Sequence, residues 1–75
     1  MKHTEQVVKE IVEELYETSV QKEEVLTLDS FTWVILIEEL ERAFELRIEL
    51  DEIKPENFSS VRVITQFIQD RQRVT

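Results

Sequence analysis

The chain has 75 residues, and its 17 acidic and 9 basic side chains give a formal net charge of -8. At this length the sequence supports one domain, residues 1–75, whose core is too small to enclose a deep catalytic cleft. We therefore expect no enzymatic activity and no catalytic residue. The negative charge repels nucleic-acid phosphates and anionic lipids and attracts basic protein surfaces, which disfavours nucleic acid and membranes as partners.

The sequence has no cysteine and a single histidine, His3. This composition excludes disulfides, a thiolate zinc site and a cysteine nucleophile, and we expect no metal site. The N-terminal residues lack the apolar stretch of a signal peptide, and the longest apolar run, Trp33 to Ile37, is too short to cross a bilayer. We expect a cytoplasmic protein.

Apolar residues repeat at helical spacing from Thr4 to Glu17, which predicts the first helix, with Thr4 as its candidate cap. The repeat stops from Thr18 to Leu28, where we expect a connecting loop. Apolar residues within this loop indicate that it is pinned to the core. The helix stripe contains Val7, Val8, Ile11, Val12, Leu15 and Tyr16, and the loop residues are Val25, Leu26 and Leu28.

The second predicted helix begins at Ser30 and ends near Glu45, with Asp29 or Ser30 capping its first amides. Its apolar residues fall on two faces. One face is predicted to be buried, and the other forms an exposed docking patch or is covered by the neighbouring loop. The core face contains Trp33, Leu36, Ile37, Leu40, Ala43 and Phe44; the second face contains Phe31, Val34 and Ile35 beside Glu38, Glu41, Arg42 and Glu45.

The remainder of the chain predicts one or two short helical turns and a last long helix. Between residues 46 and 58 the pattern is irregular, and Pro55 keeps the preceding residue out of helical geometry. Leu50, Ile53 and Phe58 are expected to anchor these turns. Ser59 or Ser60 is expected to cap the last helix, which frays from Arg71 to Thr75. Its inward residues are Val61, Val63, Ile64, Phe67 and Ile68. The expected fold class is all-α, with three main helices and a short third helix.

Two segments carry a more specific signal. The first is Leu28-Asp29-Ser30-Phe31, followed by Val34, Leu36, Ile37, Glu38, Leu40, Glu41 and Phe44, and the second is Pro55-Glu56-Asn57-Phe58-Ser59-Ser60-Val61. Together they resemble the modification-site helix, the short third helix and the start of the fourth helix in the acyl carrier protein and peptidyl (thiolation) carrier domain family. The resemblance spans most of the chain and implies a four-helix bundle of the acyl-carrier type.

The resemblance also implies a covalent cofactor and a role. Ser30 matches the serine to which a separate phosphopantetheinyl transferase attaches 4'-phosphopantetheine, using coenzyme A and a divalent metal. Asp29 matches the acidic residue that helps to hold the transferase's metal and shapes the helix start. Such a protein carries acyl, aminoacyl or peptidyl groups as thioesters for fatty acid, polyketide, nonribosomal peptide or related biosynthesis. Trp33 is then either core or a wall of the space that shelters part of a bound chain.

The partners of a carrier are the enzymes that process its cargo. Here Glu38, Glu41 and Glu45 are expected to steer the basic surfaces of acyl-, aminoacyl- or peptidyl-processing enzymes. The centre of each brief contact consists of Phe31, Val34 and Ile35. We expect a monomer, and pairing through this patch would instead give a homodimer.

Two other functions are compatible with the residues. The first is an unmodified, carrier-like interaction module in which Ser30 serves as a helix cap. The second is a small enzyme that uses Glu38 and Glu41 as paired carboxylates, which the lack of an enclosing pocket disfavours. Two departures from common carriers are the absence of a glycine shortly before the Asp-Ser pair and a shorter first loop.

The acidic composition predicts that salt stabilises the fold. Raising the ionic strength from about 0.05 M to about 0.5 M shortens the Debye length to a few Å and screens the repulsion among the acids. We expect the Tm to rise with sodium chloride and with magnesium, as measured by circular dichroism. A Tm that stays constant across the titration would contradict this explanation.

Overall fold

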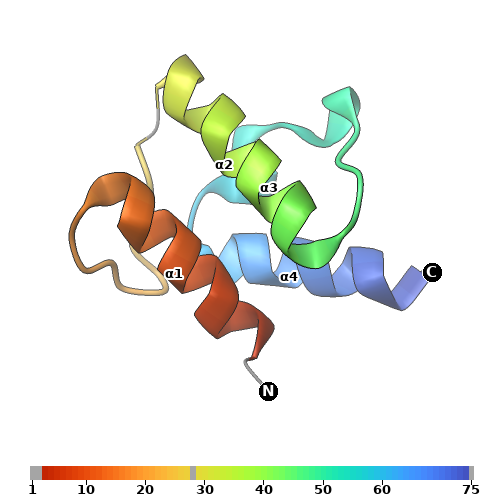
Figure 1. The fold of residues 1–75 in the computed structure, drawn as a ribbon, viewed down its shortest axis with the longest axis horizontal. Helices are drawn as coiled ribbons and strands as arrows, with labels where there is room; N and C mark the ends of the chain where they lie inside the picture. The colour runs from red at the N-terminus through yellow and green to blue at the C-terminus, as the bar shows by residue number, and fades with distance from the viewer. Residues whose placement is uncertain (1–2, 28, 75) are drawn as a thin grey trace.

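Three long helices and one short helix form the fold in the computed structural model, which describes residues 3–27 and 29–74 (Figure 1). No strand occurs within these residues, so the expected all-α class is confirmed. The short helix is the third, as predicted, and a single 3-10 turn, η1, precedes it. The elements are α1 (Thr4–Tyr16), α2 (Ser30–Phe44), η1 (Leu50–Glu52), α3 (Pro55–Phe58) and α4 (Val61–Val74).

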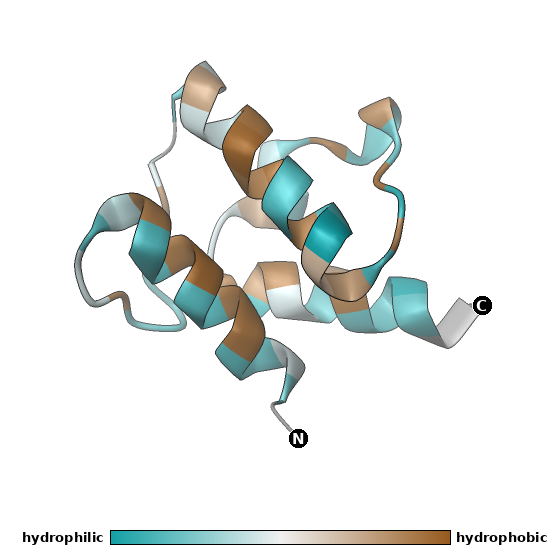
Figure 2. Cartoon of the chain, in the orientation of Figure 1, coloured by the Kyte–Doolittle hydropathy of each residue, from teal (hydrophilic) through white to brown (hydrophobic). Residues whose placement is uncertain are grey.

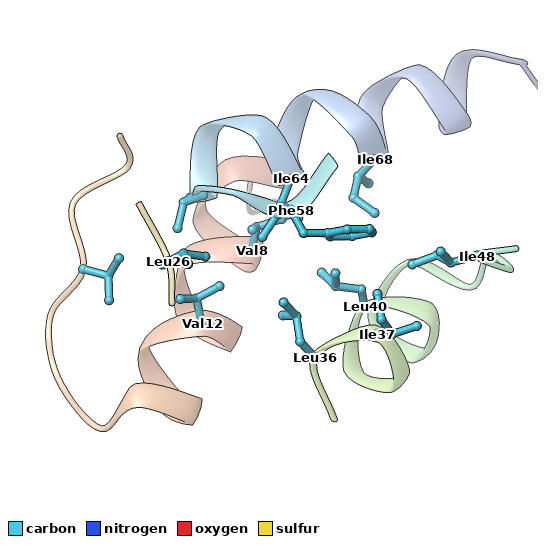
Figure 3. Close-up of a cluster of buried hydrophobic side chains, with 12 residues drawn as sticks. Val8, Val12, Leu26, Leu36, Ile37, Leu40, Ile48, Phe58, Ile64 and Ile68 are labelled. Carbon is cyan, nitrogen blue, oxygen red and sulfur yellow. The ribbon is translucent and has the colours of Figure 1, made fainter. Parts of the chain in front are cut away.

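The core lies where α1, α2 and α4 meet. The first helix contacts both of the other long helices, and α3 packs against α4. Figure 2 shows apolar residues recurring along α1 and α2 between hydrophilic ones, as the sequence spacing predicts. The buried apolar side chains, most of them labelled in Figure 3, are Val8, Val12, Val20, Leu26, Leu36, Ile37, Leu40, Ile48, Phe58, Val61, Ile64 and Ile68.

The core face of α2 is narrower than the sequence predicts. Leu36, Ile37 and Leu40 are buried, whereas Trp33 and Phe44 are half-buried. The prediction was wrong for Ala43, which is exposed. This residue lines a surface hollow between α1 and α2, so its small side chain stays accessible to solvent at the margin of the helix contact.

The ends of α1 and α4 differ in part from the prediction. The cap of α1 is His3, not Thr4, and its side chain makes no capping hydrogen bond. Ser60 is the cap of α4, because its hydroxyl accepts a hydrogen bond from the Val63 amide at 3.2 Å. The helix continues to Val74 instead of fraying from Arg71, whose side chain is bonded to the segment before α3. Thr75 lies outside the described residues.

The loop between α1 and α2 is pinned to the core, as predicted, by residues that differ in part from those expected. Leu26 is buried and donates its amide to the Ser59 carbonyl at 2.7 Å, and Val20 is also buried. Val25 is 73% exposed, so its predicted anchoring role was wrong. The core contact is made instead by its neighbour Leu26, whose amide bond to Ser59 holds the loop against the start of α4. Leu28 lies outside the described residues.

Both α1 and α2 end without glycine, at a glutamate in the left-handed conformation. The φ angles are 57° at Glu17 and 51° at Glu45. The amide of each residue donates to the carbonyl four residues earlier, on Glu13 and Glu41 respectively. An L-residue strains its backbone in this region, where helices commonly place glycine.

Each of these two helix ends also has a second hydrogen bond, which offsets the strain. The Glu13 carboxylate accepts the Val20 amide at 2.8 Å, and the Glu41 carboxylate accepts the Ile48 amide, also at 2.8 Å. The donor in each case is a buried apolar residue seven positions after the acceptor. The chain thus repeats one device, in which a glutamate in the last turn holds the returning chain against the core.

Glycine at either left-handed position should stabilise the fold. Glu17→Gly and Glu45→Gly each remove a left-handed strain of about 1–2 kcal/mol and add the conformational entropy of glycine, for a net gain of about 0.5–1 kcal/mol. We expect an increase of a few °C in Tm, measured by circular dichroism. The matched controls Glu17→Gln and Glu45→Gln remove the same charges while keeping the strain. An equal increase in the glutamine variants would assign the effect to charge instead.

Candidate functional site

Asp29 begins α2 and is its cap. Its backbone is extended, its carboxylate accepts the Thr32 amide at 2.8 Å, and its carbonyl accepts the Trp33 amide at 3.0 Å. The hydrogen bond from Thr32 favours the ionised carboxylate and lowers the pKa of Asp29 below its ordinary value of 3.8. Of the two capping residues that the sequence allowed, the structure therefore assigns the role to Asp29.

Ser30 is the first residue of α2 and is exposed. Among residues 3–27 and 29–74, none forms a hydrogen bond with its hydroxyl. The hydroxyl is thus not required for capping, and no histidine or carboxylate is hydrogen-bonded to it as a base in the described chain. An exposed alcohol without a base is a poor nucleophile by itself, and the exposure of Ser30 leaves its hydroxyl accessible from solvent.

An apolar groove of about 470 Å³ begins beside Ser30. One wall is α2, and the other is the segment between α2 and α3, which runs back alongside α2 to the right of this helix in Figure 1. Ser30 and Glu38 lie two helical turns apart on the same side of α2, so the groove follows the helix from the hydroxyl. The apolar lining consists of Trp33, Val34, Ile37, Leu50 and Ile53.

Trp33 belongs to both the core and the groove. It is half-buried, and its ring meets the buried ring of Phe58 edge-on with the ring centroids 6.1 Å apart. The same side chain lines the groove. The large aromatic ring thus contacts the core residue Phe58 and also contributes to the groove wall; a role in sheltering a bound chain stays a prediction.

The exposed apolar patch contains two of the three predicted residues and one that was not predicted for it. Phe31 and Val34 are 71% and 57% exposed, and Leu50 of η1 joins them with 85% exposure. Ile35 is only half-buried and lies in a hollow with Ile11 and Leu15 of α1, so it is not part of this surface. We define the docking patch as Phe31, Val34 and Leu50. The prediction that Leu50 anchors the short turns was wrong, because its side chain is exposed in η1. Periodicity within α2 alone could not reveal that a residue of another element joins this surface.

The three glutamates expected to steer partners occupy different environments. Glu38 is exposed and borders the groove, and Glu45 is exposed at the far end of α2. Glu41 is half-buried, and its carboxylate accepts the Ile48 amide. Its position therefore makes it primarily a structural residue. The free acid closest to the docking patch on α2 is Glu38.

Another surface hollow lies elsewhere and is lined mainly by polar residues. It has a volume of about 790 Å³ between the first turn of α1 and α4, and its lining includes Lys9, Lys22 and Arg62. Several of the few basic residues are thus gathered away from Ser30. Within the described residues no three His, Asp or Glu side chains are grouped to hold a metal ion, and no helix is both long and apolar enough to span a bilayer.

Comparisons with known proteins find no counterpart for this chain: no family model, no curated protein and no solved structure matches it. The site is therefore defined by its own geometry. It combines a capped helix start at Asp29, the exposed hydroxyl of Ser30, an apolar groove and the docking patch.

The Asp29 cap predicts a pH-dependent loss of stability. Because its folded pKa is lowered, the carboxylate stabilises the fold above about pH 3.8, and this contribution disappears as the pH falls through the lower folded value. Asp29→Ala should therefore lower the Tm at pH 7, with the difference from the parent shrinking below pH 3.8. Asp51→Ala, which removes an exposed aspartate from η1, is the matched control. Equal effects of the two substitutions at pH 7 would contradict the capping role.

Proposed function

We propose that this chain is a carrier protein of the acyl-carrier type, modified with 4'-phosphopantetheine on Ser30. The observation that carries the proposal is the exposed Ser30 hydroxyl. It does not cap the helix, because Asp29 does, and it lies at one end of an apolar groove. A serine serving merely as a cap would have its oxygen bonded to the amides of the first turn, and Asp29 takes that role here.

The arrangement of helices supports the same proposal. The two segments that resemble carriers form the start of α2 and the α3–α4 junction, and the short α3 lies between two long helices. The loop before Ser30 is held without glycine. The Tyr16 hydroxyl donates to the Thr27 carbonyl at 3.1 Å, and the Arg62 amide donates to the Lys22 carbonyl at 2.8 Å. These bonds hold the short first loop in place although it contains no glycine.

The residues at the helix start fit a phosphodiester on Ser30. The side chain is exposed, so the added group meets no steric obstacle, and an anion beside the first turn of a 15-residue helix is favoured by the helix dipole. In the transfer, the Ser30 oxygen would bond to phosphorus as the nucleotide part of coenzyme A departs, and a transferase base would take the hydroxyl proton. Asp29 would help to hold the transferase's metal. The arm, when bound, supplies the thiol that this chain lacks.

The groove and the docking patch would then handle cargo and partners. An apolar acyl chain attached through Ser30 could lie against Trp33 and Ile53, out of water. Phe31, Val34 and Leu50 would form the desolvated centre of contact with acyl-, aminoacyl- or peptidyl-processing enzymes. Exposed acids such as Glu38 contribute only about 0–1 kcal/mol per ion pair, which suits encounters that must be brief.

The alternative is an unmodified interaction module with the same fold. It is favoured by the exposure of three large apolar side chains, Phe31, Val34 and Leu50, which would serve a stable protein partner equally well. In that case the Ser30 hydroxyl is simply a tolerated polar group in the first helical turn. The two functions differ in whether Ser30 is a substrate of a transferase.

A transferase assay distinguishes these functions. The purified chain is incubated with coenzyme A, magnesium and a broad-specificity phosphopantetheinyl transferase, and its intact mass is measured. We expect one added arm, absent from Ser30→Ala. Ser19→Ala, which removes another exposed serine, is the matched control and should be modified like the parent.

The folding of each variant is checked by its helical circular dichroism. Failure of several transferases to modify a folded parent chain would favour the interaction module. Modification of Ser30→Ala would show that the arm is attached elsewhere and would overturn the proposed site.

A further inference from the structure

Apolar packing holds only part of the wall of the groove opposite α2. This groove wall consists of residues 46–54, within which Ile48 is buried and Leu46 and Ile53 are half-buried against the core. Leu50 also lines the groove, yet it is 85% exposed. Because the turn at Leu50 gains little from apolar burial, polar bonds contribute to where this part of the wall stands relative to α2.

Arg71 of α4 supplies bonds to both ends of the groove wall. One guanidinium nitrogen donates to the Arg47 carbonyl at 2.7 Å, and the other donates to the Glu52 carboxylate. Arg47 lies before η1, and Glu52 is the last residue of η1. A single side chain thus fastens the entry and the exit of the turn to α4.

The Glu52 carboxylate is also held by a hydrogen bond within its own segment, independently of Arg71. It accepts the Glu49 amide at 2.9 Å in a reciprocal capping box, and the Glu52 carbonyl accepts the Asn57 side-chain amide at 2.8 Å. The acceptor for Arg71 is therefore preorganised, so little side-chain entropy remains to be lost when the ion pair forms.

The Arg71–Glu52 pair is also better shielded from solvent than another ion pair of α4. Its side chains are 30% and 28% exposed, whereas those of Arg62 and Glu23 are 65% and 69% exposed. Solvent and salt screen the half-buried pair less. Of these two ion pairs, we therefore expect the one formed by Arg71 to stabilise the folded chain more.

We propose that Arg71 is a positioning residue that preorganises the groove for an apolar ligand. By holding residues 46–54 at a set distance from α2, it keeps Leu50 and Ile53 in place before a ligand arrives. If the wall is already ordered, ligand binding does not include the entropy cost of ordering it. That the natural ligand is a chain tethered to Ser30 rests on the proposed function, whereas the positioning by Arg71 does not.

The test uses the unmodified chain and a neutral apolar dye, phenylnaphthylamine. Trp33 is the single tryptophan and lines the groove, so energy transfer from Trp33 reports dye bound at this site. Arg71→Met keeps the aliphatic stem and should weaken dye binding by roughly three- to tenfold, the effect of having to order one or two side chains. Arg71→Lys retains the charge with Glu52 but cannot hold both acceptors, and should restore part of the affinity.

Arg62→Met is the matched control, because it removes the same charge and an ion pair from the same helix. It should bind the dye as the parent does. Hydrogen exchange adds a second measurement: the Glu49, Glu52 and Ile53 amides should exchange faster in Arg71→Met, while the Leu40 amide in the core stays protected.

Three results would overturn the proposal. The first is unchanged dye affinity and unchanged exchange of the wall amides in Arg71→Met. The second is an equal loss of affinity in Arg62→Met, which would indicate a general effect of charge or stability. The third is a parent chain that does not bind the dye. None of these results depends on a transferase, so they are independent of the outcome for Ser30.

Discussion

The carboxylate of Glu41 determines where α2 ends and where the groove begins. It accepts the Ile48 amide, while the Glu41 carbonyl accepts the amides of Glu45 and Leu46. These bonds turn the chain at the end of the helix and bring Ile48 into the core. The following residues then return alongside α2, where Leu50 and Ile53 face the groove. The apolar space beside Ser30 therefore depends on a polar bond at the opposite end of the helix.

The elements that sequence predicts best are those determined by local rules. The apolar repeats of α1, α2 and α4 place Val8, Leu40 and Ile64 in one core, because burying one stripe per helix decides the packing. The start of α2 could also be predicted from the sequence, because aspartate is a residue type that accepts hydrogen bonds from first-turn amides. The short α3 follows from Pro55 at its first position, where the missing amide hydrogen has no helical partner to lose.

The features that sequence did not predict depend on residues that meet only after folding. Ile35 has the same periodicity as Phe31, and only the position of α1 decides that it lies in a hollow with Leu15. The half-buried Glu41 looks like any acid on an exposed stripe until the Ile48 amide is placed beside it. The side-chain bonds of Arg71 join α4 to two points of the groove wall, and nothing in the spacing of arginines along α4 distinguishes this residue from Arg62.

Capping and the proposed modification fall on different residues at the start of α2, Asp29 and Ser30. A single residue that both capped the helix and carried a group would lose its cap on modification, and α2 would be destabilised as cargo was loaded. Here the carboxylate of one residue keeps the first turn in place, and the neighbouring hydroxyl stays exposed. Chemistry at Ser30 would thus leave the Asp29 cap and the first turn of α2 in place. In the proposed carrier, the backbone around the groove and the docking patch would then keep its position relative to Ser30 whether or not a group is attached.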